Sequence, residues 1–206
     1  MVYNIHGGHN PSGKIACGAS DLLDESREDR KICKEVVRLL KKKGHKAYNC
    51  TVSNGTSQTD VLRKICTKCN KRQAALDVSI HLNSGRNDHK GDKKIAGTEI
   101  WCTQSVGIKK TVGNRILANM KKLGFTNRGI KTTGNLYYLN HTINKAILIE
   151  VCFVDDRDDY NLYKKLGYKK IAKAILLWQE DMQSIVRKQK KIMKPGRNPW
   201  SFLLQK

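Results

Sequence analysis

The stretch LDVSIHLNS, residues 76–84, has the pattern of a buried β-strand with polar side chains at its end. Apolar residues alternate with other residues along it, and His81 and Asn83 lie at its end. Residues 2–5 form a second short apolar stretch of this kind, and residues 146–151 form a third, interrupted by Glu150. Long stretches with helical periodicity separate these strands. The sequence therefore favours an α/β layer architecture.

The helical stretches are amphipathic. Residues 26–43, 57–71 and 106–123 each bring apolar side chains onto one side of a helix, and a glycine follows the first and the third as a stop signal. The remaining predicted elements are two strands and a pair of helices broken near Gly167: residues 46–52, 97–102 and 157–190. Strands that alternate with such helices predict an α/β fold, a mostly parallel twisted sheet with helices on both faces.

Charge is the most unusual property of the composition. The 206 residues fit one domain with a substantial core, and 40 Lys and Arg against 18 Asp and Glu give a formal charge of +22. Such a field attracts polyanions: nucleic acid, anionic lipid or the phosphate-rich polymers of a Gram-positive wall. The stretch from Val186 to Lys206 is basic and has no acidic residue. It is either an attachment segment or a strap that packs on the core.

The cysteines and the N-terminal residues indicate the cellular compartment in which the protein is made. The chain has seven cysteines, an odd number, and several fall in predicted helices or strands, which favours reduced thiols over a disulfide framework. Cys66 and Cys69 form the one CxxC motif, a weak zinc candidate without a second pair. The sequence opens without a signal peptide pattern, and it has no apolar run long enough to span a membrane. We therefore expect a protein made in the cytoplasm.

Several groups with metal-binding or acid/base chemistry fall at strand ends. The first strand leads into His6-Gly7-Gly8-His9, His81 ends the strand of residues 76–84, and Glu150 ends that of residues 146–151. Ligands of open α/β sheets bind at the carboxyl ends of the strands, so these groups should meet at one edge. Glu25, just before the first helix, is within loop reach of His9.

Each of these residues also has an ordinary structural interpretation. Glu25 could complement the N-terminus of the helix that follows it, and His81 could be a hydrogen-bonded core histidine. Glu150 is harder to explain, because burying a carboxylate between apolar neighbours is costly unless it is paired or has a function. Together, two histidines and a glutamate are a ligand set of catalytic zinc, and a second glutamate can act as a base in hydrolysis.

Four motifs in this order resemble a known family. They are Gly8-His9-Asn10, Asp24-Glu25 at the start of a helix, SIHLN at residues 79–83 and LIEVCF at residues 148–153. They resemble the zinc-dependent N-acetylmuramoyl-L-alanine amidases (amidase type 3), and among these the catalytic domains of clostridial phage endolysins and autolysins. The resemblance covers about residues 1–178 and includes KKKGHKA after the first helix and NLYYLN before the last motif.

The resemblance implies a site and a reaction. His9, Glu25 and His81 would bind Zn²⁺, and Glu150 would be the catalytic acid/base in a peptidoglycan hydrolase. Zinc-activated water would cleave the amide bond between N-acetylmuramic acid and L-alanine. Many relatives carry Asp-Pro before the Gly-His pair, where this chain has His6-Gly7, so His6 is a rival ligand.

The resemblance also implies an organisation and a place of action. Residues 1–178 would be the zinc amidase catalytic domain, and residues 179–206 a basic C-terminal helix and tail. The substrate would be cell-wall peptidoglycan, reached after release from the cell, with anionic wall polymers as further partners and neither nucleic acid nor membrane as a partner.

Two alternatives remain open at this level. A zinc peptidase that cuts within the peptidoglycan stem peptide would use the same ligands. A basic nucleic-acid-binding protein would suit the charge of +22, but it would not explain a glutamate in a hydrophobic strand or histidines at strand ends.

Overall fold

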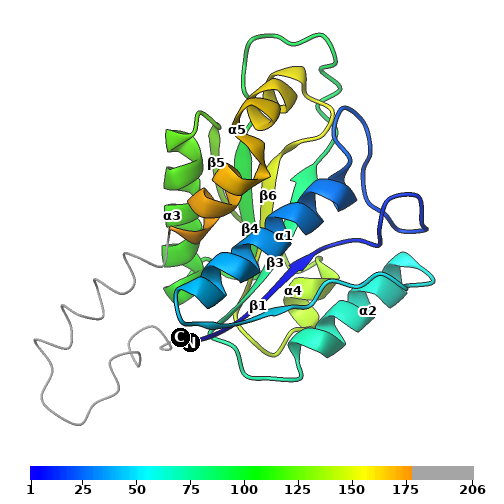
Figure 1. Ribbon diagram of the computed structural model, residues 1–206, viewed down its shortest axis with the longest axis vertical. Helices are drawn as coiled ribbons and strands as arrows, with labels where there is room; N and C mark the ends of the chain where they lie inside the picture. The colour runs from blue at the N-terminus through cyan, green and yellow to red at the C-terminus, as the bar shows by residue number, and fades with distance from the viewer. Residues whose placement is uncertain (178–206) are drawn as a thin grey trace, which may run out of the picture.

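A six-stranded sheet forms the centre of the computed structural model, which describes residues 1–177 (Figure 1). The strands lie in the order β2-β1-β3-β6-β4-β5. β4 runs antiparallel to β6, and the other neighbouring pairs are parallel, so the predicted mostly parallel sheet is confirmed. The strands are β1 Val2–Gly7, β2 Lys46–Asn49, β3 Leu76–Asn83, β4 Thr98–Cys102, β5 Asn127–Thr132 and β6 Ala146–Phe153.

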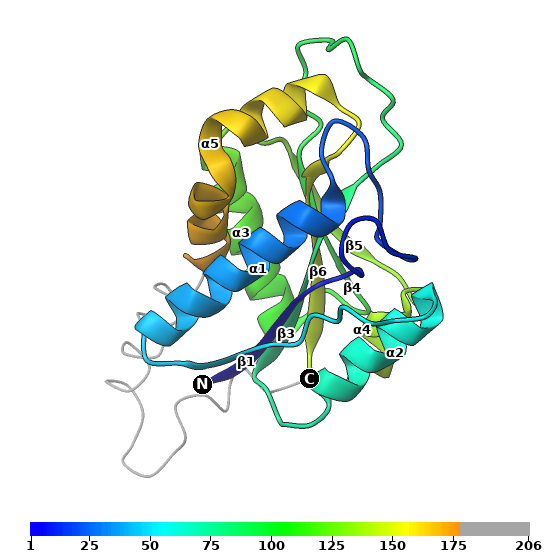
Figure 2. The same cartoon turned by 45° about the vertical axis from the view of Figure 1, so that its right-hand side comes forward.

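Helices cover both faces of the sheet, as predicted. Figure 2 shows α1, α3 and α5 on one side of the sheet and α2 and α4 on the other. The helices are α1 Glu25–Lys42, α2 Gln58–Cys69, α3 Gly107–Lys122, α4 Tyr137–His141 and α5 Arg157–Leu176. α5 is broken at Gly167, which has φ 72° and ψ 154°, so the predicted break is confirmed.

The two faces of the sheet differ in chemistry. Successive strand residues point to opposite faces, and those on the α1, α3 and α5 side are apolar: Tyr3, Ile5, Val78, Ile80, Ile100, Ile147 and Ile149. The intervening residues on the α2 and α4 side include many polar groups: Asn4, His6, Asp77, Ser79, His81, Glu99 and Glu150. The main hydrophobic core therefore lies on one face, and the polar groups collect on the other.

α1 begins at the edge of the sheet where the parallel strands end. The side chain of Asp24 caps it by accepting a hydrogen bond from the Arg27 N–H. The buried stripe of α1 then packs on the sheet, with Ile32 and Leu40 fully buried, and each such side chain contributes about 1.5–3 kcal/mol of transfer free energy. Cap and stripe together fix Glu25, the first residue of the helix.

Two elements were not predicted. β5 is an edge strand whose four central residues are half-buried, and it carries one large apolar residue, Ile130. α4 has five residues, too few for a helical period to be visible in the sequence. β2 also ends earlier than predicted, at Asn49. The predicted basic segment of residues 179–206 lies outside the described residues.

All seven cysteines are free, and six of them are buried. Cys66 and Cys69 lie on α2 and pack in the apolar cluster between α2, α4 and the sheet. Among residues 1–177, neither belongs to a group of three side chains that could hold a metal ion. In the same part of the chain, no helix combines the length and apolar character needed to cross a membrane.

Candidate metal centre

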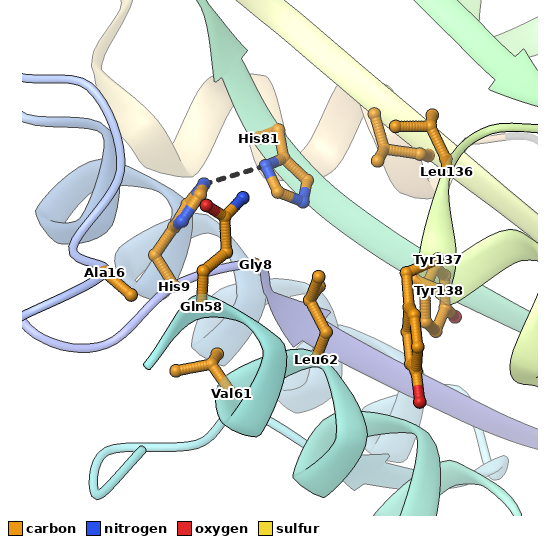
Figure 3. Close-up of a pocket in the computed structure, with 11 residues that line it drawn as sticks. Gly8, His9, Ala16, Gln58, Val61, Leu62, His81, Leu136, Tyr137 and Tyr138 are labelled. Carbon is orange, nitrogen blue, oxygen red and sulfur yellow. Dashed lines mark hydrogen bonds between the residues drawn. The ribbon is translucent and has the colours of Figure 1, made fainter. Parts of the chain in front are cut away.

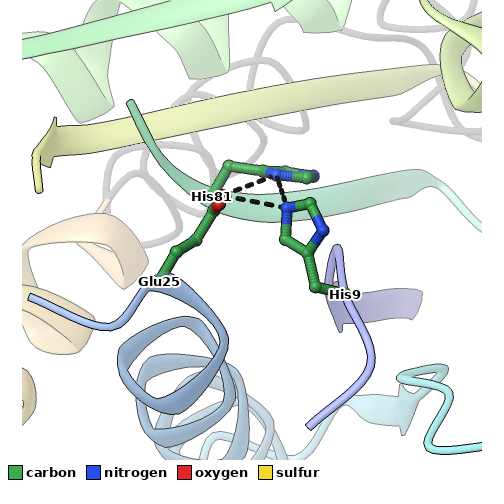
Figure 4. Close-up of side chains that lie close together, drawn as sticks. All are labelled: His9, Glu25 and His81. Atoms are coloured by element: carbon green, nitrogen blue, oxygen red, sulfur yellow. Dashed lines mark hydrogen bonds and ion pairs between the residues drawn. The ribbon is translucent and has the colours of Figure 1, made fainter. Parts of the chain in front are cut away.

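Three side chains from separate parts of the chain meet at the carboxyl ends of the strands (Figure 4). His9 comes from the loop after β1, Glu25 from the start of α1 and His81 from β3. His9 Nε2 lies 3.1 Å from both Glu25 Oε1 and His81 Nδ1, and His81 Nδ1 lies 3.0 Å from the same carboxylate oxygen. Two imidazole nitrogens and one carboxylate oxygen thus surround one point.

Two glycines make this close approach possible. A Cβ on Gly8 would lie 1.9 Å from the His81 ring. A Cβ on Gly18 would lie 2.5 Å from Glu25 Oε2 and 2.7 Å from the His9 ring, and Gly18 has φ +78°. Any side chain at either position would displace a member of the group. The glycine backbone therefore lies directly against the three side chains.

Backbone donors hold the Glu25 carboxylate in place. Oε2 accepts a hydrogen bond from the Ala19 N–H at 2.9 Å, and Oε1 accepts one from the Leu82 N–H at 3.1 Å. Burial alone would raise the pKa of Glu25, but hydrogen bonds with His81 and His9 outweigh it and hold the pKa well below its ordinary value. Glu25 is therefore an oriented, charged carboxylate.

The loop that carries His9 is anchored from α1. The fully buried Asp29 accepts a hydrogen bond from the Gly8 N–H at 3.0 Å, and Arg30 donates to the His9 carbonyl. Burial, followed by the charge of Glu25, raises the pKa of Asp29 to about 9. Asp29 was not predicted from the sequence. Its signal was an acidic residue in the apolar stripe of the helix, three positions before Ile32.

Glu150 lies beside the group without belonging to it. It pairs in register with His81 on the neighbouring strand, and its side chain is partly exposed. Its Oε2 atom is nevertheless buried and has no hydrogen-bond partner among residues 1–177. Burial, followed by the charges of Glu25 and Glu99, raises the pKa of Glu150 well above its ordinary value. This environment favours the protonated form of the Glu150 carboxyl group.

His6 occupies a different environment from His9. It is buried on the sheet and packs edge-on against Tyr138, with ring centroids 4.4 Å apart. Burial, followed by the charge of His81, lowers the pKa of His6 to about 3. The structure places His6 outside the group of three converging ligand atoms.

A second group of carboxylates, Asp88, Asp92 and Asp158, also lies close together among the described residues. Its oxygens accept hydrogen bonds from backbone N–H groups of the surrounding loop. The Gly91 and Asp92 N–H groups donate to Asp88, and the Lys93 N–H donates to Asp158. These hydrogen bonds explain why the three carboxylates lie close together: they stabilise the loop.

Two cavities flank the group. One, of about 100 Å³, lies on the histidine side (Figure 3) and is lined by Gly8, His9, Ala16, Gln58, Val61, Leu62, His81, Leu136, Tyr137, Tyr138 and Leu148. The other, of about 270 Å³, lies on the Glu150 side and is lined by Asn83, Glu99, Trp101, Thr133, Asn135, Leu136 and Glu150. Leu136 borders both cavities. Glu99 and Trp101 were not predicted from the sequence as site residues.

A mostly parallel α/β sheet with this ligand set at its carboxyl edge, beside a glutamate of raised pKa, is typical of metal-dependent hydrolases. Residues 2–177 match the family of N-acetylmuramoyl-L-alanine amidases, and the chain belongs to this family. The family resemblance seen in the sequence is thereby confirmed.

Known proteins of bacteria and phages are similar to this chain. An uncharacterised protein of Clostridium perfringens is 31% identical over 85% of this chain and 50% of its own length. The endolysin of Bacillus phage SPP1 is 28% identical over 78% of this chain and 58% of its own length. The chain thus spans about half the length of the curated relatives it matches.

Solved structures share the fold. The catalytic domain of the CD27L endolysin, which targets Clostridia difficile, superposes with a TM-score of 0.74 at 26% identity and covers 88% of this chain and 97% of that domain. The catalytic domain of CwlV, an amidase of Paenibacillus polymyxa, has a TM-score of 0.70 at 21% identity. The match covers 89% of this chain and 98% of that domain.

Proposed function

We propose that the protein is a zinc-dependent peptidoglycan hydrolase that cleaves the amide bond between N-acetylmuramic acid and L-alanine. Family membership over residues 2–177 supports the amidase reaction. The observation that carries the proposal is the convergence of His9, Glu25 and His81 beside a glutamate of raised pKa. The finer assignments, zinc and the role of each residue, rest on the chemistry of the donor set.

The donor set fits zinc. Two imidazole nitrogens and one carboxylate oxygen are a common ligand set of catalytic zinc, which leaves a further position open. His9 Nε2, His81 Nδ1 and Glu25 Oε1 already lie within 3.1 Å of one another. When bound there, zinc supplies Lewis acidity, which polarises the scissile carbonyl and lowers the pKa of water.

Glu150 moves the proton in this proposal. Its carboxylate takes a proton from the attacking water, and the same group then donates it to the nitrogen of L-alanine as the amide C–N bond breaks. The direction of the pKa shift fits this role, because a carboxylate with a raised pKa accepts a proton more readily than an ordinary one. The products are a lactyl carboxylate on the sugar and a peptide with a free amino group.

The surrounding residues orient these groups. The Ala19 and Leu82 N–H groups hold the Glu25 carboxylate, and Asp29 holds the turn that presents His9. Such contacts with the residues around metal ligands fix their geometry and tune their affinity.

Wall digestion tests the reaction. The full chain is incubated with purified Gram-positive walls, and the soluble products are analysed by mass spectrometry. The proposal predicts stem peptides that begin with a free L-alanine and muramic acid with a free lactyl carboxylate. Products cut inside the stem peptide, with the muramoyl–alanine bond intact, would instead favour a zinc peptidase.

The net charge of +22 supports a second contact with the wall. We propose that anionic wall polymers attract the protein by screened electrostatics. Binding to walls stripped of their phosphate polymers should then be weaker and less sensitive to salt than binding to native walls. Equal binding at all salt concentrations would contradict this contact.

A further inference from the structure

The two cavities beside the candidate metal centre have opposite chemistry. The cavity on the histidine side is lined mainly by apolar side chains from α2, α4 and β6, such as Val61, Leu62 and Leu148 (Figure 3). The cavity on the Glu150 side is lined by two amides, a hydroxyl, two carboxylates, an indole and the side chain of Leu136. A substrate that spans the centre therefore meets an apolar wall on one side and a polar wall with an aromatic ring on the other.

We propose that the cavity lined by Asn83, Glu99, Trp101, Thr133 and Asn135 is a sugar subsite that binds the N-acetylmuramic acid ring. This inference rests on the proposed function, and it assigns the two halves of the substrate to the two cavities. The sugar carries hydroxyl and acetamido groups that need hydrogen-bond partners, and its ring also has an apolar C–H face. L-alanine carries a methyl group, which suits the apolar cavity.

The polar wall is held rigid by one carboxylate. Glu99 is 2% exposed and accepts hydrogen bonds from Asn83 Nδ2 at 3.1 Å and from Trp101 Nε1 at 2.9 Å. It also accepts from Arg128 Nε at 2.7 Å and Lys131 Nζ at 2.6 Å. Two residues that line the cavity are therefore fixed through Glu99 before any ligand arrives, which reduces the entropy lost on binding.

Trp101 provides the surface against which a sugar ring would lie. It is partly buried on β4, and the hydrogen bond from its Nε1 to Glu99 fixes the orientation of the indole. Lys131 Nζ lies 5.2 Å from the centroid of the indole ring and also bonds to Glu99. Aromatic rings offer a large apolar contact area at a small cost in side-chain entropy.

The hydrogen-bonding groups lie near this ring. Thr133 and Asn135 follow β5 and line the cavity, and the Asn135 N–H donates to Thr133 Oγ1 at 3.0 Å. Asn135 is exposed, so its amide is accessible to a ligand. Glu150 borders the same cavity, so a sugar held there would present its lactyl carbonyl next to the proposed acid/base.

The test compares two substrates with the 206-residue chain. One is N-acetylmuramoyl-L-alanyl-D-isoglutamine, and the other is lactoyl-L-alanyl-D-isoglutamine, which has the same scissile bond but no sugar ring. For Trp101→Ala we expect kcat/KM on the muramoyl substrate to fall about tenfold or more, mainly through KM, and to change by less than about twofold on the lactoyl substrate. Leu62→Ala, in the apolar cavity, is the matched control and should lower kcat/KM on both substrates equally.

Two further variants separate binding from folding. Asn135→Ala alters an exposed side chain and should show a smaller loss confined to the muramoyl substrate. Trp101→Phe keeps an aromatic surface and should restore most of the activity lost in Trp101→Ala. If the Trp101 and Asn135 variants lower kcat/KM on both substrates equally, the sugar subsite is wrong while the amidase function stands.

Calorimetric titration with N-acetylmuramic acid alone gives a readout that does not depend on catalysis. The wild-type protein should bind the sugar, and Trp101→Ala should weaken that binding about tenfold or more. If the wild-type protein cleaves neither substrate, the proposed function fails, and this titration still decides the subsite. Equal affinity of the wild-type protein and Trp101→Ala for the sugar would overturn the proposed sugar subsite.

Discussion

The two faces of the central sheet differ in role: one packs in the main hydrophobic core, and the other carries the residues of the candidate metal centre. On the face covered by α1, α3 and α5, strand residues such as Ile80 and Ile149 are fully buried in the main core. On the other face, the residues that follow them in sequence are His81, which belongs to the candidate metal centre, and Glu150, which lies beside it. A single strand therefore contributes side chains to both the main core and the candidate metal centre. The two sets stay on opposite faces because successive side chains of a strand alternate.

The coverage of the two faces explains how the polar face stays accessible. α1, α3 and α5 have 18, 16 and 20 residues, whereas α2 and α4 have 12 and 5. The shorter helices leave two cavities at the carboxyl ends of the strands. Mutations that compare neighbouring residues on the two faces should therefore separate loss of activity from loss of stability.

The largest effect should come from His81→Ala. This change removes one of the three proposed ligand atoms, so bound zinc should be lost and wall lysis should fall to background. Metal analysis and a turbidity assay on the same sample check this. Treatment of the wild-type protein with a chelator should have the same effect and should be reversed by added zinc. A His81→Ala protein that retains a full equivalent of zinc would remove His81 from the ligand set.

Glu150→Gln should reduce turnover by about 10²–10⁴-fold, the usual range for a positioned general acid/base. Zinc content should stay near that of the wild-type protein, because Glu150 lies outside the His9, Glu25 and His81 group. Stability should hold or rise, since the change removes a carboxylate whose buried Oε2 atom has no partner among residues 1–177. Near-normal lysis would rule out the catalytic role, and loss of zinc would make Glu150 a ligand.

Ile149→Ala, one residue earlier, should have the opposite profile. Ile149 is fully buried in the main core, so its truncation should cost about 2–5 kcal/mol of unfolding free energy. Lysis per folded molecule should stay within about threefold of the wild-type rate, because the side chain points away from the centre. Denaturant unfolding and lysis assays at low temperature check this. A fully stable but inactive protein would contradict the division between the faces.

His6→Ala should have a smaller effect, of about 1–3 kcal/mol in stability, because the ring packs on Tyr138 in the interior. Zinc content should be unchanged. Thermal unfolding and metal analysis of the purified variant decide between packing and ligation. Loss of zinc in this variant would show that His6, and not His9, is the ligand.

The smallest effect should come from salt. Raising the ionic strength from about 0.05 M to about 0.3 M should weaken wall binding several-fold, because exposed charges are screened within a shorter Debye length. Cosedimentation with purified walls measures this. The rate of hydrolysis of a soluble muramoyl peptide under the same conditions serves as the control and should change much less.

The sequence predicted the fold well where apolar periodicity was strong. The buried strands and the amphipathic helices were found because burial sets their patterns. β5 and α4 were missed because a half-buried edge strand with one large apolar residue and a five-residue helix leave little pattern. The structure brings His9, Glu25 and His81 together at one edge of the sheet. The strand-end rule predicted this place for His9 and His81, and Glu25 was expected within loop reach of His9.

The rest of the candidate site depends on contacts between segments distant in sequence. Asp29 is notable because it accepts the Gly8 N–H across 21 positions, and Glu99 because residues from β3, β4 and β5 donate to it. No local pattern encodes those partners. A buried acidic residue within an apolar stripe, as at Asp29, was the one available signal.

The most direct test of the candidate metal centre is the position of zinc in a crystal structure of the metal-loaded 206-residue chain, located by anomalous diffraction at the zinc edge. The account predicts one strong peak within about 2.0–2.2 Å of His9 Nε2, Glu25 Oε1 and His81 Nδ1, with Glu150 beside it but not bonded to it. A peak bound by His6 or Glu150, or one held by Asp88, Asp92 and Asp158, would contradict it.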